Sequence, residues 1–309
     1  DFFFDVQLLD DRVTVSWIVS LLGSSLFLFL IAALLGRKRR LSDCRMALPV
    51  ATAVAVAGTL ALGFLPFQLA AAPAYFAIAL VISAAEAVLW ILWGERYACI
   101  DASFTINRIG TVFGLTLFLC VLIAYLLPSL LAAPFAALLP LVSGLALGVT
   151  RTDGRDTFPV LLPRSATKSG FKNMLGVSFV TLFACAACYF LSCIIPWEQL
   201  PTSDDSFSFG ILGGALFILV IVGIYTLSRN HLNIFKIYPA LLVALMVGFA
   251  LFLSTPLLWL AAFVIGIGIQ ALFEVLLIMY FGILTTKGYA TPALTFAMAG
   301  GFVRLGLAA

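Results

Sequence analysis

The chain has 309 residues, of which 63% are hydrophobic and only 10% are charged, and its formal net charge at pH 7 is +3. Soluble globular domains carry about 25% charged residues, so a water-soluble fold is excluded and lipid must be the solvent for most of this chain. The six cysteines and the single histidine, His231, form no metal-ligand or disulfide pattern. The C-x-x-C of Cys185 and Cys188 lies inside an apolar run and indicates helix packing. No motif of an enzyme is present, so we expect no catalytic activity and no cofactor.

Ten segments are each apolar over the roughly 20 residues that a helix needs to cross a bilayer. In chain order they are 13–36, 47–65, 74–93, 109–127, 130–149, 174–195, 208–228, 235–254, 257–282 and 289–309. Prolines stand at several of the junctions between them, where a break in the helical hydrogen-bond ladder is easiest to accommodate. This pattern predicts an all-α, polytopic membrane protein with ten transmembrane helices.

The basic residues predict how these spans are oriented. If residues 1–12 lie outside, all but Arg12 and Arg304 of the 17 lysines and arginines fall in loops on the inner side. Cytoplasmic loops carry such an excess of lysine and arginine. We therefore expect a multi-pass protein of the bacterial inner (cytoplasmic) membrane, whose chain starts and finishes outside.

An internal repeat is indicated by the ends of the third and ninth segments. The third ends in Glu86, seven mostly bulky apolar residues and Gly94, and the ninth ends in Glu274, seven such residues and Gly282. A basic loop and then a proline recur at a similar offset. These matching features are Arg37 and Pro49 in the first half and Arg229 and Pro239 in the second.

The repeat predicts two homologous halves that run in the same sense through the membrane. They are an N-terminal half at 1–149 and a C-terminal half at 174–309, joined by a cytoplasmic linker at 150–173. One further helix at each end would put both termini inside. We therefore expect the first half to lack its first helix and the second half to lack its last, within a 6+6 architecture.

This layout resembles the major facilitator superfamily, whose members carry G-x-x-x-D-R-x-G-R-[RK] in the loop after their second helix. Gly36, Arg37 and Lys38 match the last three positions of that motif. Ala33 and Leu34 stand where the motif has its aspartate and first arginine. Losing the aspartate removes the group expected to gate the rocking of the two halves, which weakens an interpretation as a transporter.

A second segment, LWILWGERYA at 89–98, resembles LW-x-LWGE-x-YA in the membrane domain of membrane-bound LuxR-type regulators of the Eggerthella group of actinobacteria. Trp93, Gly94 and Glu95 carry the resemblance. It implies a facilitator-like domain that senses a small molecule for a transcriptional regulator, which would contact DNA only through a helix-turn-helix beyond Ala309. The alternatives are a major facilitator secondary transporter of a small solute and a membrane scaffold without a ligand.

Three ionisable residues, Glu86, Glu274 and Arg304, lie within the predicted spans. A charge in mid-membrane costs at least about 2.5–3.5 kcal/mol, so such residues are candidates for ligand binding. With Trp90 they form the predicted site, whose two carboxyls would bind a cationic or hydrogen-bonding ligand or take up protons. The alternatives are carboxyls that hydrogen-bond between helices for packing, and a Trp90 that belongs to an interfacial aromatic belt. We expect Arg304 to pair with Glu274.

Overall fold

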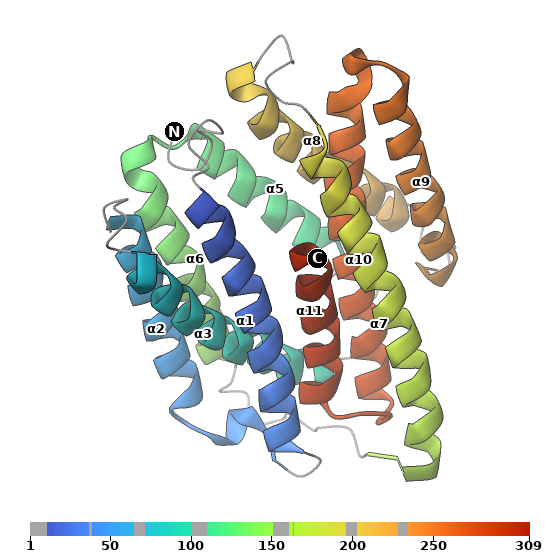
Figure 1. Cartoon of the computed structure of the whole chain (residues 1–309). Coiled ribbons are helices and arrows are strands. Elements are labelled where there is room, and N and C mark those ends of the chain that lie inside the picture. The colour runs from blue at the N-terminus through green and yellow to red at the C-terminus, as the bar shows by residue number, and fades with distance from the viewer. Residues whose placement is uncertain are drawn as a thin grey trace.

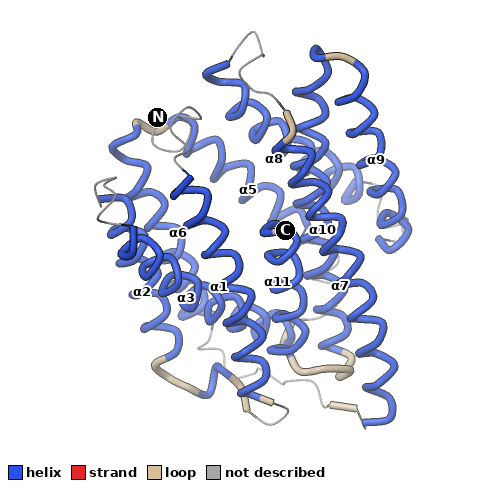
Figure 2. The backbone as a smooth tube through the Cα atoms, in the orientation of Figure 1, coloured by secondary structure: helices blue, strands red, loops and turns tan. Residues whose placement is uncertain are grey.

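The computed structural model describes residues 11–36, 39–64, 72–100, 110–150, 161–162, 164–195, 203–227 and 234–309. Within these ranges the chain forms ten α-helices, two short 3-10 helices and no strand (Figures 1 and 2). The α-helices are α1 (Asp11–Leu35), α2 (Ala47–Phe64), α3 (Ala72–Ala98), α5 (Gly110–Leu126), α6 (Ser129–Thr150), α7 (Arg164–Cys193), α8 (Ser203–Leu227), α9 (Ile234–Ser254), α10 (Trp259–Thr286) and α11 (Pro292–Ala308). The 3-10 helices are η2 (Leu41–Asp43) and η6 (Pro256–Leu258). The predicted all-α class is confirmed.

Six of these helices are long and apolar enough to cross a membrane. Their apolar stretches are Trp17–Leu35, Ala47–Phe64, Pro73–Ala98, Leu131–Thr150, Gly170–Ser192 and Pro256–Thr286. In the described part of the chain, α5, α8, α9 and α11 are apolar over shorter stretches of 10–17 residues. The chain is therefore a multi-pass helical membrane protein, and the full count of ten spans stays a prediction.

Helices α7, α3 and α10 (which ends at Thr286) extend beyond their predicted spans on the side that we expect to be cytoplasmic. Helix α7 begins at Arg164, so the second part of the segment predicted as a linker is helical. Helix α3 continues through Gly94 and Glu95 to Ala98. Hydropathy detects only the part of a helix that can lie in hydrocarbon, whereas the backbone ladder continues into polar sequence until a breaker or cap stops it.

Local sequence explains several helix ends. Gly36 follows the last turn of α1 with a φ of 56°, a left-handed conformation that favours glycine. At the start of α11, the Thr291 side chain accepts a hydrogen bond from the Leu294 backbone N–H and Pro292 occupies the first turn. Proline is not confined to helix ends, however: Pro134 and Pro140 lie inside α6. Membrane helices tolerate such breaks where neighbouring groups satisfy the freed carbonyl.

The helices pack in two groups, which meet in the middle of the bundle (Figure 1). In one group α1 packs against α3, and α2 packs against both α3 and α6. In the other, α10 packs against α7, α8, α9 and α11, and α11 also packs against α7. The groups are joined where α1 and α3 contact α11 and where α3 contacts α10, and α5 packs against α8. Helix α11 therefore touches both groups.

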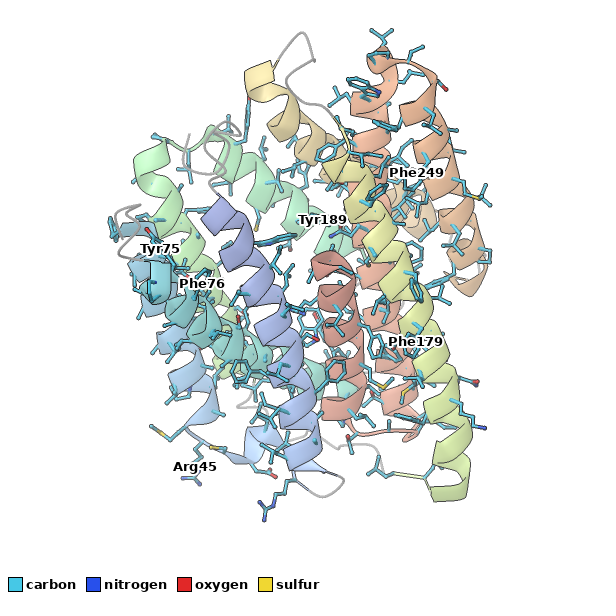
Figure 3. The ribbon with its side chains drawn as sticks, viewed as in Figure 1. Arg45, Tyr75, Phe76, Phe179, Tyr189 and Phe249 are labelled. Atoms are coloured by element: carbon cyan, nitrogen blue, oxygen red, sulfur yellow. The ribbon has the colours of Figure 1, made fainter. Side chains whose placement is uncertain are left out.

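Burial is uneven between the centre and the outside of the bundle. Most side chains of α10 and α11 are buried, including Phe273, Phe281 and Phe296. Large apolar side chains on the outer helices are exposed, such as Leu145 on α6 and Met246 on α9. Lipid would cover these outer faces. Figure 3 shows Arg45 at the lower end of the bundle, where α1 finishes and α2 begins, which is the end predicted to face the cytoplasm.

Candidate functional site

Two of the predicted site residues form an ion pair between the helix groups. Nη2 of Arg304, on α11, lies 4.0 Å from Oε2 of Glu86, on α3. The Arg304 side chain is 15% exposed and that of Glu86 is 50% exposed. The carboxylate thus remains open on one side, although it lies well inside the apolar stretch of α3.

The Trp90 ring makes a second contact with Arg304. The Arg304 Cζ atom lies 4.9 Å from the centroid of the Trp90 ring, a cation–π arrangement. The Trp90 indole N–H donates to the Phe296 carbonyl at 2.9 Å, and Nη1 of Arg304 donates to the Gly300 carbonyl at 3.2 Å. A Cβ at Gly300 would lie 2.6 Å from Nε1 of Trp90, so glycine permits this close approach. The Trp90 indole therefore makes its contacts inside the protein, with α11.

The predicted ion pair between Arg304 and Glu274 is wrong. The arginine pairs with Glu86, and Glu274 forms no ion pair or hydrogen bond with another described residue. Close packing decides the partner, because Gly300 lets Trp90 of α3 approach α11 beside Arg304, and the arginine there meets Glu86 on the same helix α3. Glu274 lies partly buried on α10, which contacts both α3 and α11.

Glu95 forms a second polar contact that the sequence alone did not specify. Its side chain is buried, with 3% exposed, near the end of α3. The two carboxylate oxygens accept hydrogen bonds from the backbone N–H groups of Leu41 at 2.7 Å and Ser42 at 2.8 Å. These donors belong to η2, in the loop between α1 and α2, so Glu95 fixes that loop to α3. The sequence offers one sign of this contact, because Glu95 directly follows the apolar part of the third predicted span.

The same loop carries the half-motif Gly36, Arg37 and Lys38. Gly36 ends α1, as described above, which gives this glycine a conformational role. Arg37 and Lys38 lie outside the described residues.

The segment at 89–98 connects α3 to three neighbouring elements. Trp90 donates to α11, the Trp93 indole N–H donates to the Ser143 hydroxyl on α6 at 2.8 Å, and Glu95 accepts from η2. Gly94 faces α11, because a Cβ there would lie 2.3 Å from Cγ of Phe296. The Tyr97 ring stacks near the Phe296 ring, with centroids 6.2 Å apart. The distinctive residues of this segment are thus contact residues between helices.

Other polar contacts came from residues that the sequence did not single out. The Ser25 hydroxyl, on α1, donates to the Gly301 carbonyl on α11 at 3.1 Å. In the second group of helices, the hydroxyls of Thr181 and Tyr238 are hydrogen-bonded to each other. A lone serine or threonine in an apolar span gives no sign of its partner, which is why sequence reasoning missed them.

The described part of the chain holds no candidate metal site. No group of three or more histidine, cysteine, aspartate or glutamate side chains there could hold an ion. Cys185 and Cys188 are fully buried on α7 as free thiols. A Cβ at Gly306, on α11, would lie 3.0 Å from the Cys185 Cβ, so the cysteine packs tightly against α11. Both cysteines fit the packing role expected for them.

Comparison with known proteins does not assign the chain to a family. No protein-family model matches the sequence, and no curated protein matches it significantly.

Proposed function

We propose that this chain is the membrane-embedded small-molecule sensor domain of a membrane-bound LuxR-type transcriptional regulator of the bacterial inner membrane. The observation that carries the proposal is the contact of Glu86 with Arg304, which joins the two helix groups through charges at membrane depth. A half-exposed carboxylate in a span is costly unless it meets water, a ligand or a polar group of another helix. An ion pair that joins two groups of helices can transmit the occupancy of such a site as a change in how the groups pack.

The helix contacts support a 6+6, facilitator-like arrangement of ten spans. If the two halves are equivalent, α1, α2, α3 and α5 of the first half correspond to α8, α9, α10 and α11 of the second. Under this exchange the contact of α1 with α3 becomes that of α8 with α10, and the contact of α2 with α3 becomes that of α9 with α10. The contact between the groups, α1 with α11, becomes α8 with α5. These three pairs pack together, as a repeat requires, whereas the contacts of α11 with α10 and α3 have no counterpart of similar extent for α5 in the described residues.

A sensor is favoured over a transporter by the loop between α1 and α2. A transporter must alternate between inward-open and outward-open states, and the gating aspartate and arginine of the facilitator motif are replaced by Ala33 and Leu34. Glu95 fixes this loop to α3 through two backbone hydrogen bonds, so the loop is held within its own helix group. A sensor needs only a bias between two states, typically about 1–3 kcal/mol of coupling. The facilitator-like contact pattern itself favours the second candidate, a secondary transporter of a small solute.

Two observations test the proposal. We expect the natural coding sequence to continue after Ala309 with one more span and then a soluble helix-turn-helix, which would be the only part to contact DNA. We also expect the natural protein with all its spans, purified and reconstituted in sealed proteoliposomes, to accumulate none of a panel of radiolabelled amines, sugars and carboxylates against a gradient. A stop codon directly after the next span, or concentrative uptake by the membrane domain, would contradict the sensor and favour the transporter.

A further inference from the structure

The backbone of the loop between α1 and α2 is fixed by hydrogen bonds. Each backbone N–H from Arg39 to Cys44 donates one, and two of these go to the buried carboxylate of Glu95. The other acceptors are the carbonyls of Leu35, Arg40 and Leu41 and the exposed carboxylate of Asp43. Surface loops are ordinarily more mobile than the helices that they connect. Residues 39–46, which we call the basic loop, are thus an ordered part of the surface.

Positive charge is concentrated on the basic loop. Arg39, Arg40 and Arg45 are exposed there. Figure 3 shows Arg45 pointing away from the helices, at the end of the bundle predicted to face the cytoplasm. Together with the two basic residues that directly precede it, the loop carries five positive charges, against the negative charges of Asp43 and Glu95. This excess of positive charge favours an anionic partner.

Exposed apolar side chains border the basic loop on both helices. Leu34, in the last turn of α1, is 73% exposed. Met46, directly before α2, is 64% exposed, and Val50, in the first turn of that helix, is 50% exposed. Such side chains on membrane helices contact acyl chains, which places the basic loop at the level of the headgroups.

We propose that the basic loop binds anionic phospholipids of the inner leaflet, with Arg39 and Arg45 on the headgroup phosphate and the acyl chains against Leu34 and Met46. A guanidinium presents its N–H donors in a planar fork that matches the oxygens of a phosphate. The preference of inner loops for basic residues explains the charge, but it does not require a fixed backbone. An ordered loop loses less conformational freedom when it binds, so its hydrogen bonds favour a specific lipid contact over a diffuse attraction.

A lipid bound here would also be coupled to the candidate site. Glu95 joins the basic loop to α3, and α3 carries Glu86 and Trp90. A headgroup that holds the loop therefore helps to hold the helix that presents these two side chains. The inference applies to a sensor and to a transporter alike, so its failure would leave the proposed function untouched.

The test measures which lipid lies beside the loop. The natural protein, with Cys44 as its single cysteine, is labelled with bimane at that exposed thiol and reconstituted in phosphatidylcholine vesicles. The vesicles contain increasing fractions of doxyl-labelled phosphatidylglycerol, which is anionic, or of doxyl-labelled phosphatidylcholine, which is zwitterionic. The nitroxide of either lipid quenches bimane over a short range. Glycerol phosphate, the water-soluble part of the headgroup, serves as a competitor.

The variants separate a specific contact from a diffuse effect of charge. Arg39→Gln combined with Arg45→Gln removes two positive charges from the loop. Lys172→Gln combined with Lys287→Gln is the matched control, since both lysines are exposed at the end predicted to be cytoplasmic but lie outside the loop. Glu95→Gln removes a negative charge and weakens the attachment of the loop to α3. Gel filtration confirms that each variant is monodisperse.

We expect phosphatidylglycerol to reach half-maximal quenching at a mole fraction at least about fivefold lower than phosphatidylcholine, the effect of one basic residue near an anionic surface. The double arginine variant should lose this preference, and the double lysine control should keep it. In Glu95→Gln the preference should fall at least about twofold because the loop is less ordered, whereas a diffuse attraction would increase with the loss of a negative charge. Glycerol phosphate should not compete.

Equal quenching by the two lipids in the parent protein would overturn the inference. A preference that survives in the double arginine variant would place the lipid elsewhere. A preference that falls as far in the lysine control, or that rises in Glu95→Gln, would show a diffuse attraction and refute a specific contact. Competition by glycerol phosphate would assign the loop to a soluble phosphate compound and refute the lipid.

Discussion

Replacing Glu95 with alanine is expected to destabilise the protein by about 3–6 kcal/mol, the sum of two hydrogen bonds to a charged group at about 1.5–3 kcal/mol each. Glu95 is buried and its carboxylate satisfies the backbone N–H groups of Leu41 and Ser42. Without it, both donors lose their partner and η2 loses its attachment to α3. The measurement is thermal unfolding in detergent, combined with limited trypsin digestion. Cleavage at Arg39, Arg40 or Arg45 should become faster because the freed loop contains all three.

Two substitutions serve as controls for Glu95. Glu95→Gln keeps the shape and one acceptor oxygen, so we expect about half of the loss. Asp43→Asn lies in the same loop, where its exposed carboxylate accepts one backbone hydrogen bond at 3.3 Å from Arg40. We expect that variant to change stability by less than about 0.5 kcal/mol. If Glu95→Ala loses no more stability than Asp43→Asn, Glu95 does not hold the loop to α3.

Phe296→Ala is expected to cost about 3–5 kcal/mol, the usual range for truncating a buried phenylalanine. Phe296 is 2% exposed at the contact between α11 and α3, where its ring packs on Gly94 and stacks near Tyr97. Thermal or denaturant-induced unfolding in detergent measures the loss. The control is Phe183→Ala, since Phe183 is 68% exposed on α7 and should cost little.

A double-mutant cycle tests the contact itself. Gly94→Ala alone should cost about 1–3 kcal/mol, because its Cβ would collide with the Phe296 ring, which lies 2.3 Å away at Cγ. In the Phe296→Ala background the ring is gone, so the same substitution should be nearly neutral. Additive losses would mean that the two residues do not touch.

The sequence predicted the class and most helices of this protein, because apolar composition reports the solvent around a helix. Nine of the predicted spans start within a few residues of an observed helix or its preceding 3-10 turn, whereas α7 begins earlier, at Arg164. The exception is instructive, since residues 164–173 are too polar for hydrocarbon but contain no proline to stop a helix. Hydropathy therefore predicted only the part of α7 that can lie in the bilayer, and not the full length of the helix.

The partners of the site residues could not be predicted from hydropathy. Intramembrane charge marked Glu86 and Arg304 as candidates, but which helix faces which depends on small residues that let backbones approach. Gly300 allows Trp90 and Arg304 to lie against α11, and Gly94 allows Phe296 to lie against α3. The sequence of an apolar helix does not show whether a glycine faces lipid or an aromatic ring of a neighbouring helix. The pairing of Arg304 with Glu274 was for that reason predicted wrongly.

The central claim is that Glu86 faces an aqueous binding site rather than lipid, and cysteine accessibility tests it most directly. Glu86 and Val81 lie on the same helix with similar exposure, 50% for the Glu86 side chain and 51% for Val81. Each is replaced by cysteine in a background without the native cysteines, and membranes are treated with a charged methanethiosulfonate reagent, which reacts with thiolates in water. We expect Glu86→Cys to react at least tenfold faster than Val81→Cys. Equal and slow reaction at both positions would show that Glu86 meets lipid or protein, and would contradict the account.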